Sequence, residues 1–161
     1  MVIKLSDDEE KLKILEKVKG FLMKLERGEI SVDKKNFALD SLIVIEFEIG
    51  EDLKLKNRIL VTKDWILAKT CLMFFETVPD PELFHLMCIE MLKANFEYPE
   101  VTYSVDDEGN MYIEADMPSD TTFENFESEF NSILFGTLHF YNTICPNVSK
   151  EIYKGDTWKS I

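Results

Sequence analysis

The sequence has little of several residue types on which common functional sites depend. Its 161 residues include no glutamine, two histidines, two arginines, three cysteines and six glycines. Three widely spaced cysteines favour free thiols in a reducing compartment over a disulfide framework. No G-x-x-x-x-G-K-[ST], G-x-G-x-x-G or G-x-S-x-G motif occurs, which argues against a phosphate-cradling loop or a nucleophile elbow.

Long apolar runs are also missing. No stretch of about 18 apolar residues occurs, so we expect no membrane-spanning segment. The residues before Asp7 carry no apolar core of a signal peptide. Together with the free thiols, these features predict a cytoplasmic protein.

The charge is strongly one-sided. Lysine and arginine number 18 and aspartate and glutamate number 31, so the formal net charge is 18 − 31 = −13. Such a surface repels phosphate backbones and anionic lipids, so we expect neither nucleic acid nor membrane as a partner. Eleven acidic residues and no lysine or arginine occupy positions 94–149. This stretch predicts a negative surface, which either steers a basic partner segment or keeps the protein soluble.

The composition is that of a globular protein, with 45% hydrophobic and 30% charged residues. The length fits one domain. We therefore expect a single α+β domain over residues 1–146 and a C-terminal tail over 147–161.

Apolar periodicity and turn residues predict the order helix, three strands, helix, two strands, helix. Ser6 and Glu9 form a capping box for the first helix, Thr121 and Glu124 form one for the last, and Asp80 and Pro81 open the middle helix. This order predicts an antiparallel sheet of about five strands flanked by three helices. The expected helices are 7–27, 81–95 and 122–145, and the expected strands are 42–49, 58–62, 65–74, 101–105 and 111–115. Residues 37–39 form either a short extra strand or the start of the first long one.

This order of elements resembles the type III secretion chaperone-like fold, including the YbjN-type families. The resemblance is carried by the helix end at 91–95, the strand 101–105, the acidic turn 106–110, the strand 111–115 and the helix start at 121–124. It implies a small, acidic, cytosolic homodimer that binds an extended segment of a client protein. Residues 7–146 are covered, and no client-binding motif can be transferred.

The middle helix is apolar around most of its circumference between Leu83 and Leu92. A single small sheet cannot cover such a helix, so we expect a second subunit to bury part of it. Met-rich apolar surfaces also adapt to varied partners. The predicted partner-binding residues are Leu83, Met87 and Met91 on this helix, together with the acidic residues Glu114, Asp116, Glu124 and Glu127.

Residues that could support catalysis or bind a metal are sparse. His85 and Cys88 lie one helical turn apart and could present two zinc ligands, but further ligands at metal-binding spacing are missing. Asp106, Asp107 and Glu108 lack the spacing of a calcium loop, and we expect them to be solvated turn residues. We therefore expect no catalytic residue, no metal and no cofactor.

Two functional hypotheses remain. The first is a non-enzymatic chaperone-like or adaptor protein that binds a segment of another protein as a homodimer, with an edge strand such as 42–49 pairing with an extended peptide. The second is a small ligand-binding domain or enzyme with a pocket under the middle helix. Convergence of polar groups in one cavity would favour the second.

Overall fold

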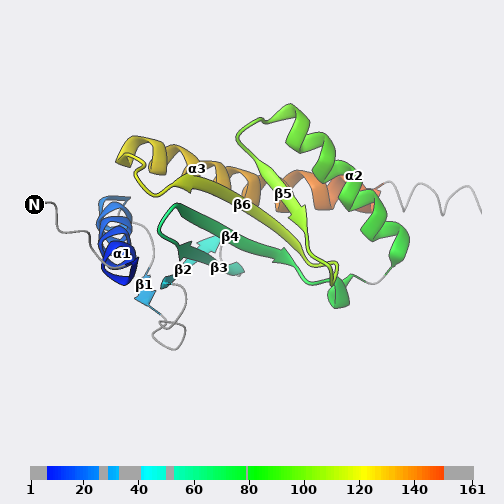
Figure 1. Cartoon of the computed structure of the whole chain (residues 1–161). Coiled ribbons are helices and arrows are strands. Elements are labelled where there is room, and N and C mark those ends of the chain that lie inside the picture. Colours follow the sequence, from blue (N-terminus) through cyan, green and yellow to red (C-terminus); the bar gives the residue numbers. More distant parts are fainter. Residues whose placement is uncertain (1–6, 26–28, 33–40, 50–52, 79, 151–161) are drawn as a thin grey trace, which may run out of the picture. The chain divides into compact units, whose positions relative to one another are not determined.

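A computed structural model describes residues 7–25, 29–32, 41–49, 53–78 and 80–150 (Figure 1). Hydrogen-bonded strands follow one another in the order β1-β2-β3-β4-β6-β5, and the pairs β1–β2, β2–β3, β3–β4 and β5–β6 are antiparallel. The α+β class predicted from the sequence is confirmed. The elements are α1 (Asp7–Leu25), β1 (Glu29–Val32), β2 (Ser41–Ile49), β3 (Leu53–Val61), β4 (Trp65–Met73), α2 (Pro81–Glu97), β5 (Thr102–Val105), β6 (Met111–Pro118) and α3 (Phe123–His139), with a 3-10 turn η2 (Phe75–Thr77) and a π-helical segment η3 (Phe140–Ile144).

The chain divides into two compact units. The first unit comprises Met1–Thr70 and Ala115–Asn131, and the second comprises Cys71–Glu114 and Ser132–Ile161. Each unit is therefore built from two separate stretches of sequence, and each has buried apolar residues of its own.

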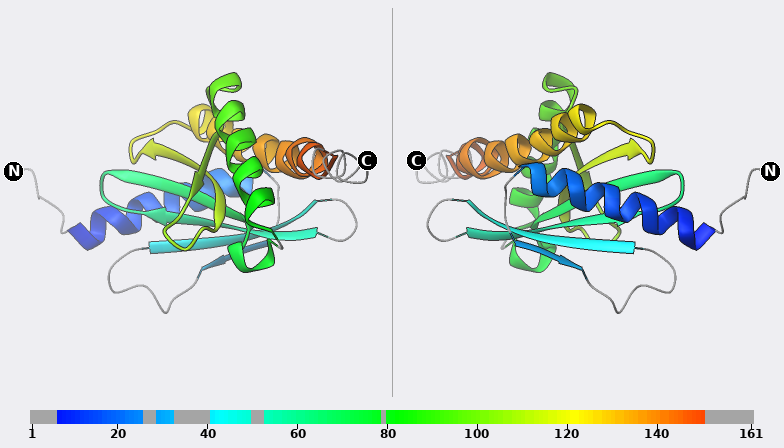
Figure 2. Two further views of the ribbon diagram at one scale, coloured as in Figure 1. Left: turned by 90° about the vertical axis from the view of Figure 1, so that its right-hand side faces the viewer. Right: turned by 90° about the vertical axis from the view of Figure 1, so that its left-hand side faces the viewer.

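In the first unit, α1 lies against one face of strands β2 and β3 (Figure 2). Leu15, Val18 and Leu22 recur at helical spacing and are at most 2% exposed, so they form the buried stripe of α1. Phe21 adds an aromatic contact to Phe126, with ring centroids 5.4 Å apart. The strands supply the facing core residues Ile43, Ile45, Ile59, Val61 and Ile66.

In the second unit, α2 lies beside β5 (Figure 1). The side chain of Asn95 on α2 connects the two elements. The carboxamide of Asn95 accepts a hydrogen bond from the N–H of Tyr103 at 2.7 Å and donates one to its carbonyl at 3.0 Å. The Tyr103 hydroxyl donates to the carbonyl of Gly136 at 2.6 Å. Asn95 thus satisfies both outward-facing backbone groups of Tyr103 on the edge strand β5, which would otherwise be open to pairing.

The turn between β5 and β6 is organised by Asp106. One carboxylate oxygen accepts from the N–H groups of Glu108 and Asn110, and the other accepts from the Tyr112 hydroxyl at 2.9 Å. Burial alone would raise the pKa of Asp106, but hydrogen bonds from Asn110, Tyr112 and Glu108 outweigh it and lower the pKa. Gly109 has a φ of +84°, a conformation that favours glycine. Asp106 is therefore a structural residue of the turn rather than only a solvated acid.

Several sequence predictions about element ends are corrected. The helix α2 ends at Glu97, two residues beyond Asn95, near which the sequence predicted its end, and the Asn95 side chain binds β5. The last helix is not stopped by Pro146: residues 145–150 are helical, and proline is tolerated in the first turn after the π-helical segment. At the start of α3, the side chain of Thr122, not Thr121, accepts the N–H of Asn125.

The strand predictions need two further corrections. The 42–49 segment is not an edge strand, because β1 pairs with Ile43–Glu46 on one side and β3 pairs along the other. The sequence missed β1, a strand of only four residues. The Ser6 cap, the possible strand at 37–39 and residues 151–161 of the expected tail lie outside the described residues.

Candidate functional site

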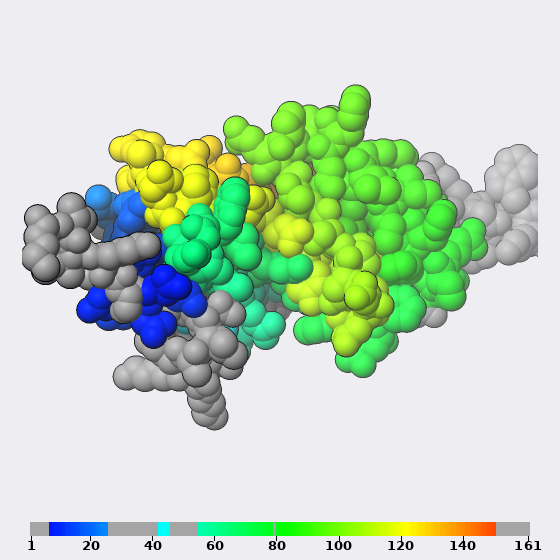
Figure 3. Space-filling view, in the orientation of Figure 1, coloured from blue at the N-terminus to red at the C-terminus, as the bar shows by residue number. Residues whose placement is uncertain are grey.

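The outward side of α2 carries an exposed apolar stripe. Leu92 is 67% exposed and Phe96 is 91% exposed, and both follow Ile89 at helical spacing (i, i+3, i+7). In the space-filling view, α2 lies at the surface of the second unit beside the β5–β6 hairpin (Figure 3). We call Ile89, Leu92 and Phe96 the α2 stripe.

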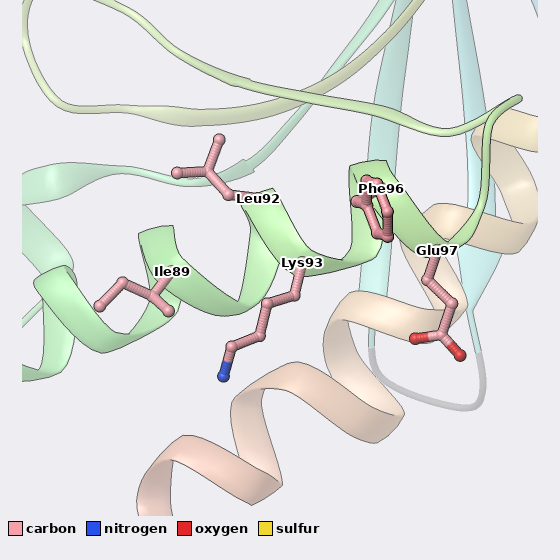
Figure 4. Close-up of a pocket in the computed structure, with 5 residues that line it drawn as sticks. All are labelled: Ile89, Leu92, Lys93, Phe96 and Glu97. Atoms are coloured by element: carbon pink, nitrogen blue, oxygen red, sulfur yellow. The ribbon is translucent and has the colours of Figure 1, made fainter.

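A shallow groove of about 640 Å³ follows this stripe. It is lined by Ile89, Leu92, Lys93, Phe96 and Glu97, all of which come from α2 (Figure 4). Lys93 forms an ion pair with Glu90 at 2.5 Å, one turn back along the helix. Such an exposed pair contributes little stability, so the charged residues flank the apolar stripe without closing it.

The opposite side of α2 forms the core of the second unit. Met87 and Met91 are each 2% exposed and Ala94 is 3% exposed, at spacings of four and three residues. The helix α2 thus has two apolar sides, one that faces the core and one that faces outward, and together they make it apolar around most of its circumference. The sequence located this helix but not the stripe, although the spacing 89, 92, 96 was a signal that could have found it.

The residues predicted to bind a partner do not all lie on exposed surface. Met87 and Met91 are buried in the core and Leu83 is half-buried, so the two methionines do not form exposed surface in this chain. The four acidic residues also belong to different units: Glu114 to the second, and Asp116, Glu124 and Glu127 to the first. Asp116 and Glu124 are exposed, whereas Glu114 and Glu127 are half-buried. Their partner-binding role stays a prediction.

Glu124 is held in its charged form by its position at the start of α3. Backbone hydrogen bonding at the helix N-terminus and the Thr122 side chain lower the pKa of Glu124, and Lys24 adds a smaller attraction. This carboxylate therefore combines exposure with a local structural role.

His85 and Cys88 do not form a metal site in the part of the chain that the structure describes. Among those residues, no three His, Cys, Asp or Glu side chains come together around a possible ion. Burial raises the pKa of the Cys88 thiol, which disfavours the thiolate needed by a metal ligand or a nucleophile. Nor is any helix of the described chain both long and apolar enough to cross a membrane.

Three tyrosines of the second unit titrate late. Burial raises the pKa of Tyr103, and raises the pKa values of Tyr112 and Tyr141 to about 12. The Tyr141 hydroxyl donates to the carbonyl of Leu72, and that of Tyr112 donates to Asp106. Each of these hydroxyls must therefore lose a hydrogen bond and become a partly buried anion when it ionises.

This arrangement predicts a loss of stability at alkaline pH. Because the pKa of these tyrosines is higher in the folded state than in the unfolded state, their protonated form stabilises the fold. This contribution to the free energy of unfolding is complete below pH 10, the ordinary tyrosine pKa, and is lost as pH rises toward about 12. We expect tyrosinate absorbance to show three late-titrating tyrosines in the folded protein, and Tyr141→Phe to remove one of them. Titration of all tyrosines near pH 10 before any unfolding would contradict this prediction.

Comparison with known proteins addresses the fold directly. A chain in the crystal structure of the ExsC–ExsE complex matches with a TM-score of 0.55 and 11% sequence identity, over 83% of this chain and 95% of that one. A chain in the HopA1–SchA chaperone–effector complex matches with a TM-score of 0.50 and 11% identity, over 82% of this chain and 98% of that one. A chain in the structure of the Yersinia pestis type III secretion chaperone SycH with a stable fragment of YscM2 matches with a TM-score of 0.47 and 12% identity, over 80% of this chain and 97% of that one.

The chain has the fold of type III secretion chaperones. This confirms the fold predicted from the order of helices and strands. The YbjN-type resemblance is not confirmed by these matches. No protein-family model and no curated protein matches the sequence.

Proposed function

We propose that this protein is a non-enzymatic, chaperone-like protein that binds a segment of another protein and acts as a homodimer in the cytoplasm. The observation that carries the proposal is the exposed α2 stripe on a chaperone fold. A chain of this fold is part of a chaperone–effector complex in the HopA1–SchA structure. A side chain such as Phe96, 91% exposed, has a large apolar area for a partner to cover.

We infer that the α2 stripe pairs with the same stripe of a second copy. Residues 89 and 96 are equally far along the helix from the point between residues 92 and 93. A two-fold axis at this midpoint would place Ile89 of one copy against Phe96 of the second copy, with the two Leu92 side chains near the axis. Closed two-fold dimers are the commonest oligomers, and their interfaces have this isologous form.

The enzyme alternative has less support. A catalytic cleft needs several polar groups that converge on one point. The groove beside α2 offers only Lys93 and Glu97 among its lining residues, and Ile89, Leu92 and Phe96 supply the rest. Such a lining suits an apolar contact better than a reaction, so the proposed function is binding.

The acidic side chains would guide the partner to its site. Charge complementarity mainly sets the association rate and the specificity, whereas apolar contacts supply most of the affinity. We therefore assign Glu114, Asp116, Glu124 and Glu127 an electrostatic steering role toward basic residues of the partner. This role fits a chain with 31 acidic and 18 basic residues.

The test is to capture the partner from native cell extract, identify it by mass spectrometry, and truncate it to the shortest segment that still binds. We expect a contiguous segment whose affinity falls with salt.

Exchanging the four acidic residues for Gln or Asn should slow association and flatten the salt dependence without changing the circular dichroism spectrum. A captured protein that is chemically converted would contradict the binding function, and an unchanged association rate would contradict the steering role.

A further inference from the structure

His85 extends the α2 stripe by one helical turn toward the start of the helix. It precedes Ile89 by four residues, so the spacing 85, 89, 92, 96 continues along one side of α2. The His85 side chain is exposed, as are those of Leu92 and Phe96. His85 therefore belongs to the surface through which the proposed dimer forms. It adds to that apolar surface a type of side chain whose charge changes near neutral pH.

The other end of the same surface is negatively charged. Glu97 is the last residue of α2 (Figure 4). Glu100 follows in the turn after the helix, and both side chains are exposed. The last turn of α2 contains no basic residue, although a cation near a helix C-terminus would be stabilised by the partial negative charge of the terminal carbonyl groups. This end of α2 therefore has the charge that favours a positive group from a partner.

The two-fold pairing of the α2 stripe brings these two ends together. Residues 85 and 100 are equally far along the chain from the point between residues 92 and 93, where the two-fold axis meets the helix. The α2 helix of the second copy then runs antiparallel, so His85 of each copy lies at the C-terminal end of the other copy's α2. At 1.5 Å per residue, His85 is about 11 Å from the axis and Glu97 is about 7 Å from it, a difference that the two side chains can span. Two-fold symmetry forms this contact twice.

We propose that His85 makes the self-association of this protein pH-dependent, and that its protonation strengthens the dimer. The protonated imidazole ring carries a positive charge and donates from both nitrogens, whereas the neutral ring carries no charge. In the dimer the charged ring meets Glu97, Glu100 and the helix C-terminus of the second copy, and in the free chain it faces water. By linkage, the dimer is favoured as pH falls through the range in which histidine titrates, at about pH 6.5.

Other titratable groups near His85 do not change charge in this range. On its own helix, Glu82 lies one turn before it and Cys88 lies one turn after it, and burial raises the pKa of the Cys88 thiol. The elements β5 and η3 lie against α2, and so does η2 through the Phe75–Phe84 ring pair. These three elements carry the titratable residues Tyr103, Tyr141 and Glu76. Between about pH 5.5 and about pH 8, tyrosine and the Cys88 thiol stay neutral and carboxylates stay charged, so the histidine is the group that changes.

This inference rests on the proposed function, because it concerns the regulation of the proposed dimer interface. It also explains how two strongly acidic surfaces can meet. Residues 71–114 contain ten acidic residues and one lysine, so two copies of this region repel each other. One positive charge from each His85, placed against carboxylates of the other copy, reduces that repulsion at the interface itself.

Sedimentation equilibrium of the full chain at fixed ionic strength tests the inference. Between about pH 8 and about pH 5.5 we expect the dissociation constant of the dimer to fall about tenfold, which corresponds to about 1.4 kcal/mol shared by two exposed contacts. His85→Gln should abolish this change. The control His139→Gln should retain it, and these two residues are the only histidines of the sequence.

Removal of the carboxylates tests the pairing from the other side. Glu97→Gln/Glu100→Gln should flatten the pH dependence although His85 is still present. The control Asp64→Asn/Asp120→Asn removes the same charge from exposed residues of the first unit and should leave the pH dependence intact. If the wild-type dimer is too tight to dissociate in this measurement, the same comparisons are made with Leu92→Ala, which weakens the apolar contact without a change of charge.

A dimer whose dissociation constant is the same at both pH values would overturn the inference. A pH dependence that persists in His85→Gln, or in Glu97→Gln/Glu100→Gln, would overturn it too. In each of these cases the dimer of the proposed function stands. A wild-type protein that is monomeric at both pH values would instead contradict the proposed dimer itself, and this inference with it.

Discussion

Replacing both Leu92 and Phe96 by glutamate is expected to convert the protein from a dimer into a monomer of 18.8 kDa. These two side chains are the most exposed apolar residues of α2, so the substitutions should not disturb the core of the second unit. Truncating one central apolar side chain of an interface costs about 2 kcal/mol or more. A two-fold interface contains each substitution twice, so four such losses, taken as additive, amount to about 8 kcal/mol, or roughly a millionfold in the dissociation constant.

Light scattering over a range of protein concentrations measures this effect. The wild type should have twice the mass of the chain, and the variant should have the mass of one chain. The matched control is Leu12→Glu/Met23→Glu on α1, because Met23 is exposed to the same extent as Leu92, at 67%. A control that dissociates as well, or a wild type that is already monomeric at micromolar concentration, would contradict the assignment of the α2 stripe to a dimer interface.

The second large effect concerns two helical glycines that should respond to alanine in opposite directions. Gly136 on α3 is buried, and a Cβ atom there would lie 2.0 Å from Cδ1 of Ile113 and 3.1 Å from Cγ1 of Val101. A Cβ atom at Gly20 on α1 would meet no atom within 4 Å. Alanine in a helix interior makes a protein about 1 kcal/mol more stable than glycine does. An extra methyl group that overpacks a core makes it about 1 to 3 kcal/mol less stable.

We therefore expect Gly136→Ala to lower the free energy of unfolding by up to about 2 kcal/mol, because about 1 kcal/mol of helix propensity offsets an overpacking cost of up to about 3 kcal/mol, and Gly20→Ala to raise it by about 1 kcal/mol. Ile113 is fully buried, so its methyl group cannot move aside without displacing its neighbours. Urea unfolding followed by circular dichroism distinguishes the two variants. A stabilised Gly136→Ala protein would mean that α3 can shift away from β6, and that the close contact does not constrain this helix.

The sequence by itself determined the local elements and their order. The aspartate–proline start of α2 appears as predicted, with the Asp80 side chain accepting the N–H of Glu82 at 2.7 Å. The acidic turn before β6 is also confirmed. These features depend on residues close together in the chain, where backbone geometry and capping act without help from distant segments. The order of these elements was enough to predict the fold.

Only the tertiary structure decided which surfaces face a partner. The sequence showed that α2 is apolar all round, but the neighbouring β5 and η3 determine that Met87 and Met91 are buried while Leu92 and Phe96 project outward. Strand pairing places β2 in the interior of the sheet. Register and packing depend on residues far apart in sequence, and a one-residue change of register moves every side chain to the other face.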